Sequence, residues 1–219
     1  DFTTGDLPTE ALDQHKRRLG LLTPVVKGWC TETAQEVASL GLQCHGGMGY
    51  IEETGIAQIV RDARILPIYE GTNGIQAMDL VVRKIIGDKG LAINELIADM
   101  RKSLSSLLPG SPLLSSQIDR FRGSVDDLEK TVSLLLKHST NRKFSGSVAF
   151  DVLMMTSTIT AAWQMFVSAE GAKLALESNK VSSEFFDDKI ATAQYFIDSI
   201  LPRYVGHFIT INSTNTGAH

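Results

Sequence analysis

The spacing of apolar residues constrains this chain more than any other feature, because it repeats every three or four positions along most of the sequence. That repeat is typical of helices that bury one face. Beyond residue 90 it recurs in four stretches, whose outer apolar positions are Ile93–Leu107, Val125–Leu135, Val148–Leu176 and Ile190–Tyr204. No stretch alternates apolar and polar residues as a half-buried strand does. We therefore predict an all-α chain whose second half is a helical bundle.

Helices are also predicted in the first half, where proline and glycine interrupt them. We expect helical structure over residues 9–42, with a break or kink at Pro24, because proline lacks the N–H of an interior helical residue. Glycines at positions 46, 47 and 49 interrupt the pattern, and a helix resumes over residues 52–64. Proline and glycine are the strongest local signals for such interruptions.

The sequence Gly87-Asp88-Lys89-Gly90 is a turn signal and the best candidate for a domain boundary. Between Pro67 and this turn we expect one more helix, capped by Thr72 or Asn73. The chain begins at Asp1 without an initiator methionine, so we expect it to be a piece of a longer polypeptide. The predicted divisions are a first helical domain over 1–86, an additional helical domain over 87–206 and a polar tail over 207–219.

Composition excludes several classes of protein. The chain has 219 residues, of which 43% are hydrophobic and 21% are charged, which is ordinary for a globular protein and unlike a disordered one. Cys30 and Cys44 cannot form a disulfide framework, and their spacing from the histidines matches no zinc motif. The most apolar window, residues 148–167, contains Asp151 and Gln164, which favours a buried bundle helix over a membrane span.

Charge argues against a dedicated nucleic-acid binder. The net charge is −4 and the isoelectric point is near 5.7, whereas such domains usually carry a basic patch. Neither half of the chain is basic on its own. We therefore expect no nucleic-acid partner.

Three short segments between residues 43 and 76 carry the candidate chemistry. They are Gln43-Cys44-His45-Gly46-Gly47-Met48-Gly49-Tyr50, Arg61-Asp62-Ala63-Arg64 and Tyr69-Glu70-Gly71-Thr72-Asn73. Paired glycines after a helix let a ligand approach the backbone, although they serve equally well as a helix C-cap with a tight turn. A glutamate just before a helix can complement the helix dipole as well as act in catalysis. The arginine cluster is expected to fix helix ends through ion pairs.

Taken together, the three segments resemble the C-terminal signature of the acyl-CoA dehydrogenase family, over residues 9–86. The helices from Lys89 onward are similar to a longer subgroup with an added C-terminal helical domain. The resemblance implies the family's C-terminal four-helix-bundle domain, here incomplete, followed by a second helical bundle. It also implies that this chain lacks the family's N-terminal helical domain and middle β-domain.

The resemblance implies a role for each matching residue. Glu70 stands at the catalytic base, which removes the α-proton of an acyl-CoA while a hydride leaves the β-carbon for the flavin, giving a trans-2-enoyl-CoA. Tyr69 and Gly71 flank the base and are implied to border the substrate. Gly74 departs from relatives that have Glu or Gln there, so it is left out of the site.

The implied cofactor is FAD, and no metal is expected. Two groups of residues match the family's FAD contacts: Gln43, Cys44, His45, Gly46 and Gly47 toward the adenine and pyrophosphate region of a neighbouring subunit, and Thr72 and Asn73 toward the ribityl and phosphate portion.

The implied partners are an acyl-CoA substrate, an electron-transfer flavoprotein and further copies of the chain in a homodimer or homotetramer. The implied location is the cytoplasm, or the mitochondrial matrix in a eukaryote. An oxidase, which passes electrons to oxygen, shares the same base. A non-catalytic relative that serves oligomerisation or nucleic-acid binding is a further alternative, against which Glu70 and the acidic isoelectric point both count.

Overall fold

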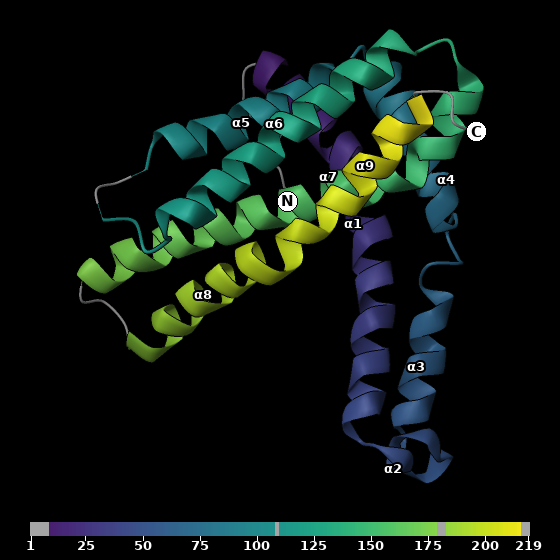
Figure 1. The fold of residues 1–219 in the computed structure, drawn as a ribbon, viewed down its shortest axis with the longest axis vertical. Helices are drawn as coiled ribbons and strands as arrows, with labels where there is room; N and C mark the ends of the chain where they lie inside the picture. The colour runs from purple at the N-terminus through teal and green to yellow at the C-terminus, as the bar shows by residue number, and fades with distance from the viewer. Residues whose placement is uncertain (1–8, 108–109, 179–182, 216–219) are drawn as a thin grey trace.

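The computed structural model describes residues 9–107, 110–178 and 183–215, and every regular element in these ranges is a helix (Figure 1). This confirms the predicted all-α fold. In order, the elements are α1 (Thr9–Cys44), α2 (Gly47–Tyr50), η1 (Glu52–Thr54), α3 (Ile56–Ile65), α4 (Asn73–Met78), η2 (Asp79–Ile86), α5 (Leu91–Ser105), α6 (Ser115–Lys137), α7 (Arg142–Glu177), α8 (Ser183–Tyr195), η3 (Phe196–Ile200), η4 (Leu201–Arg203) and α9 (Tyr204–Asn215).

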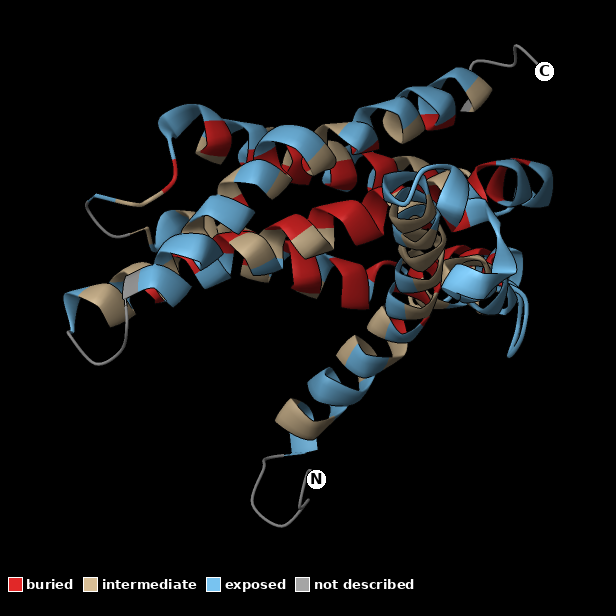
Figure 2. Cartoon of the chain, turned by 90° about the horizontal axis from the view of Figure 1, so that it is seen from below, coloured by how far each residue is buried: buried red, intermediate tan, exposed pale blue. Residues whose placement is uncertain are grey.

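The described residues form two parts, which we call the body and the arm. The arm, residues 29–66, contains the second half of α1 together with α2, η1 and α3, and it projects away from the remaining helices (Figure 1). The body contains the first half of α1 and the helices from α4 onward. Buried residues are concentrated in the body (Figure 2), whereas Gly49 is the one buried residue within 29–66, a range that is described throughout.

Helix α7 is the central helix of the body, where it contacts α1, α4, α6, α8 and α9. Its buried side chains include Phe166, whose ring stacks on that of Phe121 from α6 with a centroid distance of 5.3 Å. By length and composition α7 is the one described helix able to cross a membrane, but 61% of its most apolar window is buried inside the body. The burial of this window agrees better with the predicted bundle helix than with a membrane span.

Helix α1 joins the arm to the body and does not break at proline. The buried positions Leu21, Pro24, Val25 and Gly28 lie where it crosses the body, and the helix continues through Pro24 to Cys44. The predicted break is therefore wrong, because packing in the core holds the helix together across the missing hydrogen bond, and the kink stays a prediction. A Cβ at Gly28 would lie 2.6 Å from a Leu153 methyl, so glycine allows close contact between α1 and α7.

The predicted turn at residues 87–90 is present, with the Asp88 carboxylate accepting from the backbone N–H groups of Gly90 and Ala92 at 3.0 Å each. One hydrophobic cluster spans this turn, since it contains Ile85 on one side and Ile93 on the other. The division into domains at this point therefore stays a prediction.

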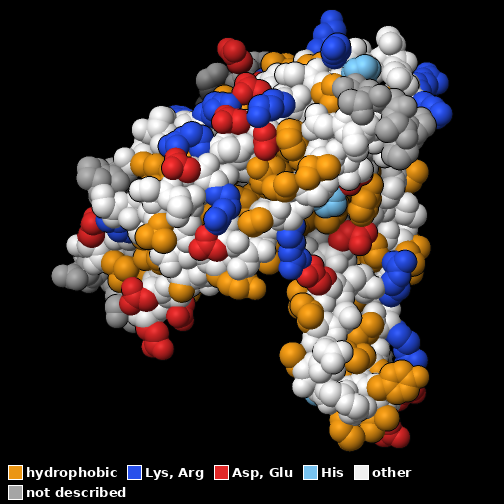
Figure 3. Space-filling view, in the orientation of Figure 1, with side chains coloured by type: hydrophobic (Ala, Val, Ile, Leu, Met, Phe, Trp, Pro, Cys, Tyr) orange, Lys and Arg blue, Asp and Glu red, His pale blue; other side chains and the backbone are white. Residues whose placement is uncertain are grey.

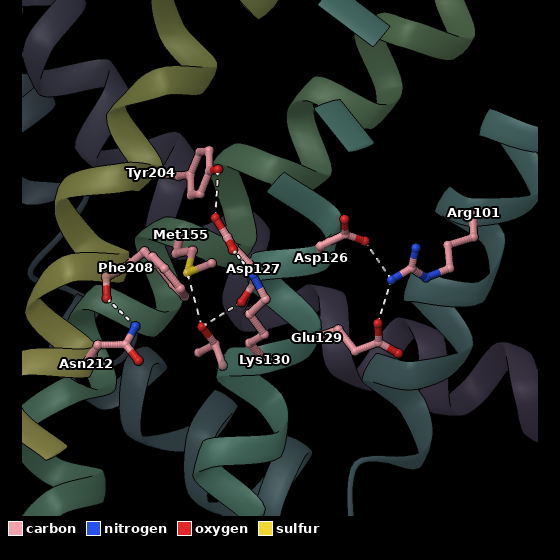
Figure 4. A network of polar contacts seen from close by, with 10 residues as sticks. Arg101, Asp126, Asp127, Glu129, Lys130, Met155, Tyr204, Phe208 and Asn212 are labelled. Carbon is pink, nitrogen blue, oxygen red and sulfur yellow. Dashed lines mark hydrogen bonds and ion pairs between the residues drawn. The ribbon is translucent and has the colours of Figure 1, made fainter. Parts of the chain in front are cut away.

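The predicted polar tail is in part a structural helix. Helix α9 covers residues 204–215, and Ile211 within it is fully buried, because the apolar period continues past the position where we ended it. The Tyr204 hydroxyl donates to the Asp127 carboxylate of α6 at 3.0 Å and ties α9 to the body (Figure 4). Residues 1–8 and 216–219 of the predicted divisions lie outside the described residues.

Candidate active site

The predicted site residues lie in two groups at opposite ends of α3 (Figure 1). Residues 43–47 form a turn at the tip of the arm, and residues 69–73 lie where α3 gives way to α4. Helix α3 has 10 residues and is about 15 Å long at the usual rise of an α-helix. One chain therefore does not bring the two groups together, although it does bring Tyr69, Glu70, Gly71, Thr72 and Asn73 into one loop.

The turn at the tip of the arm is open to solvent. Gly46 has a φ of 58°, a left-handed conformation that favours glycine, and a Cβ at Gly46 or Gly47 would meet nothing within 4 Å. Gln43 and Cys44 are exposed at the end of α1, and the ring of His45 bonds the Gly41 carbonyl at 3.0 Å through its Nδ1 atom. An extended ligand can therefore approach this backbone closely, which fits the predicted contact with a phosphate-bearing cofactor.

The second group is a loop that we call the glutamate loop, residues 67–73. Its two ends are buried, while residues 68–72 between them are exposed. The backbone N–H of Asn73 donates to the Pro67 carbonyl at 3.1 Å and closes the base of the loop. Near its tip, the Gln76 side-chain amide lies 3.4 Å from the Glu70 carbonyl oxygen and 3.5 Å from that of Gly71. The loop is therefore a turn held by hydrogen bonds, and its central residues are exposed to solvent.

Glu70 lies at the tip of this loop in an uncommon backbone conformation. Its φ is 54° and that of the following Gly71 is 84°, so two successive residues are left-handed. Such a conformation is unfavourable for glutamate, and residues in it cluster at functional sites. Within the described residues, neither the Glu70 carboxylate nor its backbone N–H makes a hydrogen bond or ion pair. Both groups are therefore open to a ligand.

Thr72 and Tyr69 flank this tip and are exposed as well. Thr72 occupies the position before α4, as predicted, but its hydroxyl makes no capping hydrogen bond. The hydroxyl of this exposed residue is therefore open to solvent. Tyr69 is 46% exposed.

Asn73 differs from the other predicted site residues because its side chain faces α1. It is 3% exposed, and its amide makes contacts only with residues of α1 among those described. The Oδ1 atom accepts from Lys27 Nζ at 2.8 Å, while Nδ2 donates to the Glu32 carboxylate and the Thr31 hydroxyl at 2.8 Å each. Sequence reasoning missed this set, because nothing in the local pattern links residues more than forty positions apart.

Of the arginine cluster predicted to fix helix ends through ion pairs, only Arg61 makes an ion pair among the described residues. Arg61 pairs with Glu52 at 2.9 Å on the exposed side of the arm, and the Gln58 amide lies 3.5 Å from the Asp62 carboxylate. Among the described residues, no group of His, Cys, Asp and Glu is arranged to hold a metal ion.

A groove of about 780 Å³ lies between the arm and the body, where Figure 3 shows the surface hollowed. It is lined by apolar side chains of α1, α7 and η3, such as Trp29, Phe150 and Phe196, and the Glu36–Arg203 ion pair crosses it. No predicted site residue lines this groove. The candidate chemistry is therefore at the glutamate loop.

Comparison with a solved structure shows the fold that this chain shares. The fold is similar to that of Caenorhabditis elegans ACDH-11, solved in complex with C11-CoA, with a TM-score of 0.59 and 23% sequence identity. The match covers 84% of this chain and 29% of that one. The likeness shows that the chain shares the all-α fold of part of that protein.

Sequence comparisons then identify the family. Residues 9–85 match the family model "Acyl-CoA dehydrogenase, C-terminal domain", and residues 92–218 match "Acetyl-CoA dehydrogenase C-terminal like". The chain belongs to the acyl-CoA dehydrogenase family.

Two curated relatives place the chain within longer proteins. It is 42% identical to the 3-methylmercaptopropionyl-CoA dehydrogenase of Ruegeria pomeroyi, over 89% of this chain and 33% of that protein. It is 30% identical to the broad-specificity linear acyl-CoA dehydrogenase FadE5 of Mycobacterium tuberculosis, over 83% of this chain and 31% of that protein. The chain therefore spans about a third of the length of these relatives.

Proposed function

We propose that this chain supplies the catalytic base, Glu70, to an FAD-dependent acyl-CoA dehydrogenase that converts an acyl-CoA to a trans-2-enoyl-CoA. The observation that carries the proposal is the unpaired, exposed Glu70 carboxylate on a pinned left-handed turn, in a chain of this family. The wide similarity to named acyl-CoA dehydrogenases supports the same reaction class.

The proposed chemistry begins with transfer of the substrate α-proton to the Glu70 carboxylate. Such a proton is weakly acidic, and a carboxylate surrounded by water is a poor base for it. Binding of the acyl chain beside Tyr69 and Gly71 expels water, which disfavours the charged carboxylate and strengthens it as a base. The unpaired Glu70 N–H can donate to the thioester oxygen and stabilise the developing enolate. Glu70 would thus act twice, through its side chain and its backbone.

The residues present fit the cofactor that the family implies. The open glycine turn at the tip of the arm and the free Thr72 hydroxyl leave room for phosphate-bearing groups. FAD, when bound, supplies the acceptor for the β-hydride. We propose that Gln43, Cys44, His45, Gly46 and Gly47 hold the FAD of a neighbouring copy, and that Thr72 and the backbone of Asn73 contact the FAD of their own copy.

This arrangement supports further proposals about partners and location. The arm exposes apolar side chains, among them Val37, Leu40, Met48, Tyr50 and Ile59, which favours burial against other domains or copies in a homodimer or homotetramer (Figure 3). We propose an electron-transfer flavoprotein as electron acceptor, and the cytoplasm, or the mitochondrial matrix in a eukaryote, as the location.

The test uses the longer polypeptide, by which we mean this chain joined to the domains expected before it. The purified protein should absorb near ~450 nm, as bound flavin does, and one or more acyl-CoA thioesters of a chain-length panel should bleach that absorbance without oxygen. A trans-2-enoyl-CoA should be recovered. Protein without flavin that binds DNA, or flavin that no thioester in the panel reduces, would contradict the proposal.

A further inference from the structure

The connection between Asn73 and α1 has a consequence for the position of Glu70. Residues 68–72 of the glutamate loop are exposed, so the loop is held mainly at its two buried ends. One end is Pro67, and the other is Asn73, which lies three residues from Glu70. The side chain of Asn73 reaches α1 at the level where that helix enters the arm.

The contacts of Asn73 require an amide. Its oxygen accepts from the Lys27 ammonium at 2.8 Å, and its NH₂ group donates to the Glu32 carboxylate at 2.8 Å and lies 3.2 Å from the Gly28 carbonyl. A carboxylate would keep the contact with Lys27 but would lose every bond that the NH₂ group donates, to Thr31 as well as to Glu32 and Gly28, and would face Glu32 with a like charge. An apolar side chain would leave buried polar groups without partners.

We infer that Asn73 is a positioning residue for the catalytic step. Resting on the proposed function, the inference is that the Lys27–Asn73–Glu32 contacts fix the glutamate loop, so that the Glu70 carboxylate stays where the substrate α-proton arrives. The backbone connects Asn73 to the other end of the loop, since the Asn73 N–H also donates to the Pro67 carbonyl across the base of the loop. Displacement of a catalytic group by 1 Å is enough to slow a reaction ~10²-fold.

The experiment compares variants of the longer polypeptide in anaerobic flavin bleaching by saturating acyl-CoA. The N73D variant should bleach ~10²-fold more slowly with flavin content unchanged, and in steady-state turnover its KM should change less than its kcat. Adding E32Q removes the like charge and supplies an amide donor, so N73D/E32Q should recover most of the rate. N141D is the matched control, because Asn141 caps α7 away from the loop and aspartate caps equally well.

A second readout does not depend on turnover. Hydrogen–deuterium exchange of residues 68–73 should be faster in N73D than in the parent, and N73D/E32Q should restore protection, because the loop itself is released and held again. If N73D does not fold, T31V offers a milder change that removes one acceptor of the Asn73 amide, with a smaller loss of rate.

Measurement of E70Q in parallel distinguishes the positioning role of Asn73 from the proposed function of Glu70. Normal bleaching by N73D together with inactive E70Q overturns the positioning role and leaves the proposed function intact. A slow N73D variant whose loop exchange is unchanged, or whose rate E32Q does not restore, also overturns it. Normal bleaching by E70Q overturns the proposed function itself.

Discussion

At the scale of single residues, Glu70 and Lys89 have the same backbone feature, a positive φ at a residue other than glycine. The values are 54° and 58°, and each lies in a turn that connects two helices. A turn of this kind usually carries glycine or asparagine, because a larger side chain is disfavoured there. Lys89 lies outside the candidate site, whereas Glu70 is its central residue, so the comparison separates strain from function.

We predict that Glu70→Asn raises the free energy of unfolding of the chain by about 1 kcal/mol, because asparagine tolerates the left-handed region better. Glu70→Gln should leave stability almost unchanged, which separates the backbone effect from the loss of charge. Lys89→Asn is the matched control and should stabilise by a similar amount. Urea denaturation of the four proteins measures this, and equal stability of Glu70→Asn and the parent would show that the turn is not strained.

Tyr204 offers a prediction that depends on pH. Burial and the adjacent Asp127 carboxylate raise its pKa above the ordinary value of about 10. Below pH 10 both folded and unfolded chains keep the phenolic proton, whereas above it only the unfolded chain loses it. The stabilisation from Tyr204 is therefore complete below pH 10 and is lost as the pH rises further.

Tyr204→Phe should lower the free energy of unfolding by about 1–2 kcal/mol at pH 7, because it removes a hydrogen bond to a carboxylate. The difference in the free energy of unfolding between this variant and the parent should decrease above pH 10. Tyr195→Phe, at a 63% exposed position, should change stability by less than about 0.5 kcal/mol and serves as control. A difference that is constant up to pH 11 would contradict the coupling to Asp127.

At the scale of elements, apolar periodicity alone predicted most helices, since the cores of α5, α6 and α7 lie where three- and four-residue spacing placed them. Periodicity did not predict the helix bounds that depend on packing between residues far apart in the sequence. Helix α1 continues through Pro24 because the surrounding residues are buried in the body, and α9 extends past residue 207 because Ile211 meets the core. A local pattern contains neither contact.

The candidate site shows the same division. The exposed positions of Glu70 and Thr72 follow from a turn placed between Pro67 and α4, which the sequence indicates. The burial of Asn73 does not, because its partners belong to α1 and come into reach only when the chain folds. Only the backbone of Asn73 is therefore available for the predicted contact with the cofactor.

The first turn of α7 is capped by an asparagine side chain. The Asn141 side chain accepts from the backbone N–H of Phe144 at 3.0 Å and caps α7, the central helix. Asn141→Ala should lower the free energy of unfolding by about 1 kcal/mol, whereas Asn141→Asp should leave it nearly unchanged. Thermal denaturation distinguishes the two, and equal stability of the alanine variant and the parent would exclude a capping role.

At the scale of the whole molecule, the body has a continuous core, whereas the arm leaves apolar side chains exposed. The two proposed cofactor contacts lie on or beside the arm, at its tip and at its junction with the body. Residues 43–47 and 68–72 are exposed, and the groove beside the arm involves other residues. We therefore expect a closed flavin site to need surfaces beyond these residues.

We accordingly predict that the 219-residue chain, produced alone, folds into helices but binds little FAD and does not oxidise acyl-CoA. Circular dichroism and the absorbance of bound flavin after gel filtration test this. Stoichiometric flavin on the isolated chain would contradict the requirement for further surfaces.

The central claim is that the Glu70 carboxylate accepts the substrate proton, and a single-turnover measurement tests it most directly. Longer polypeptide with Glu70→Gln is mixed anaerobically with an acyl-CoA that the parent oxidises, and flavin absorbance is followed over time. We predict the parent content of flavin and bleaching slower by at least ~10³-fold, as expected for loss of an essential proton acceptor. Bleaching at the parent rate would show that another group takes the proton.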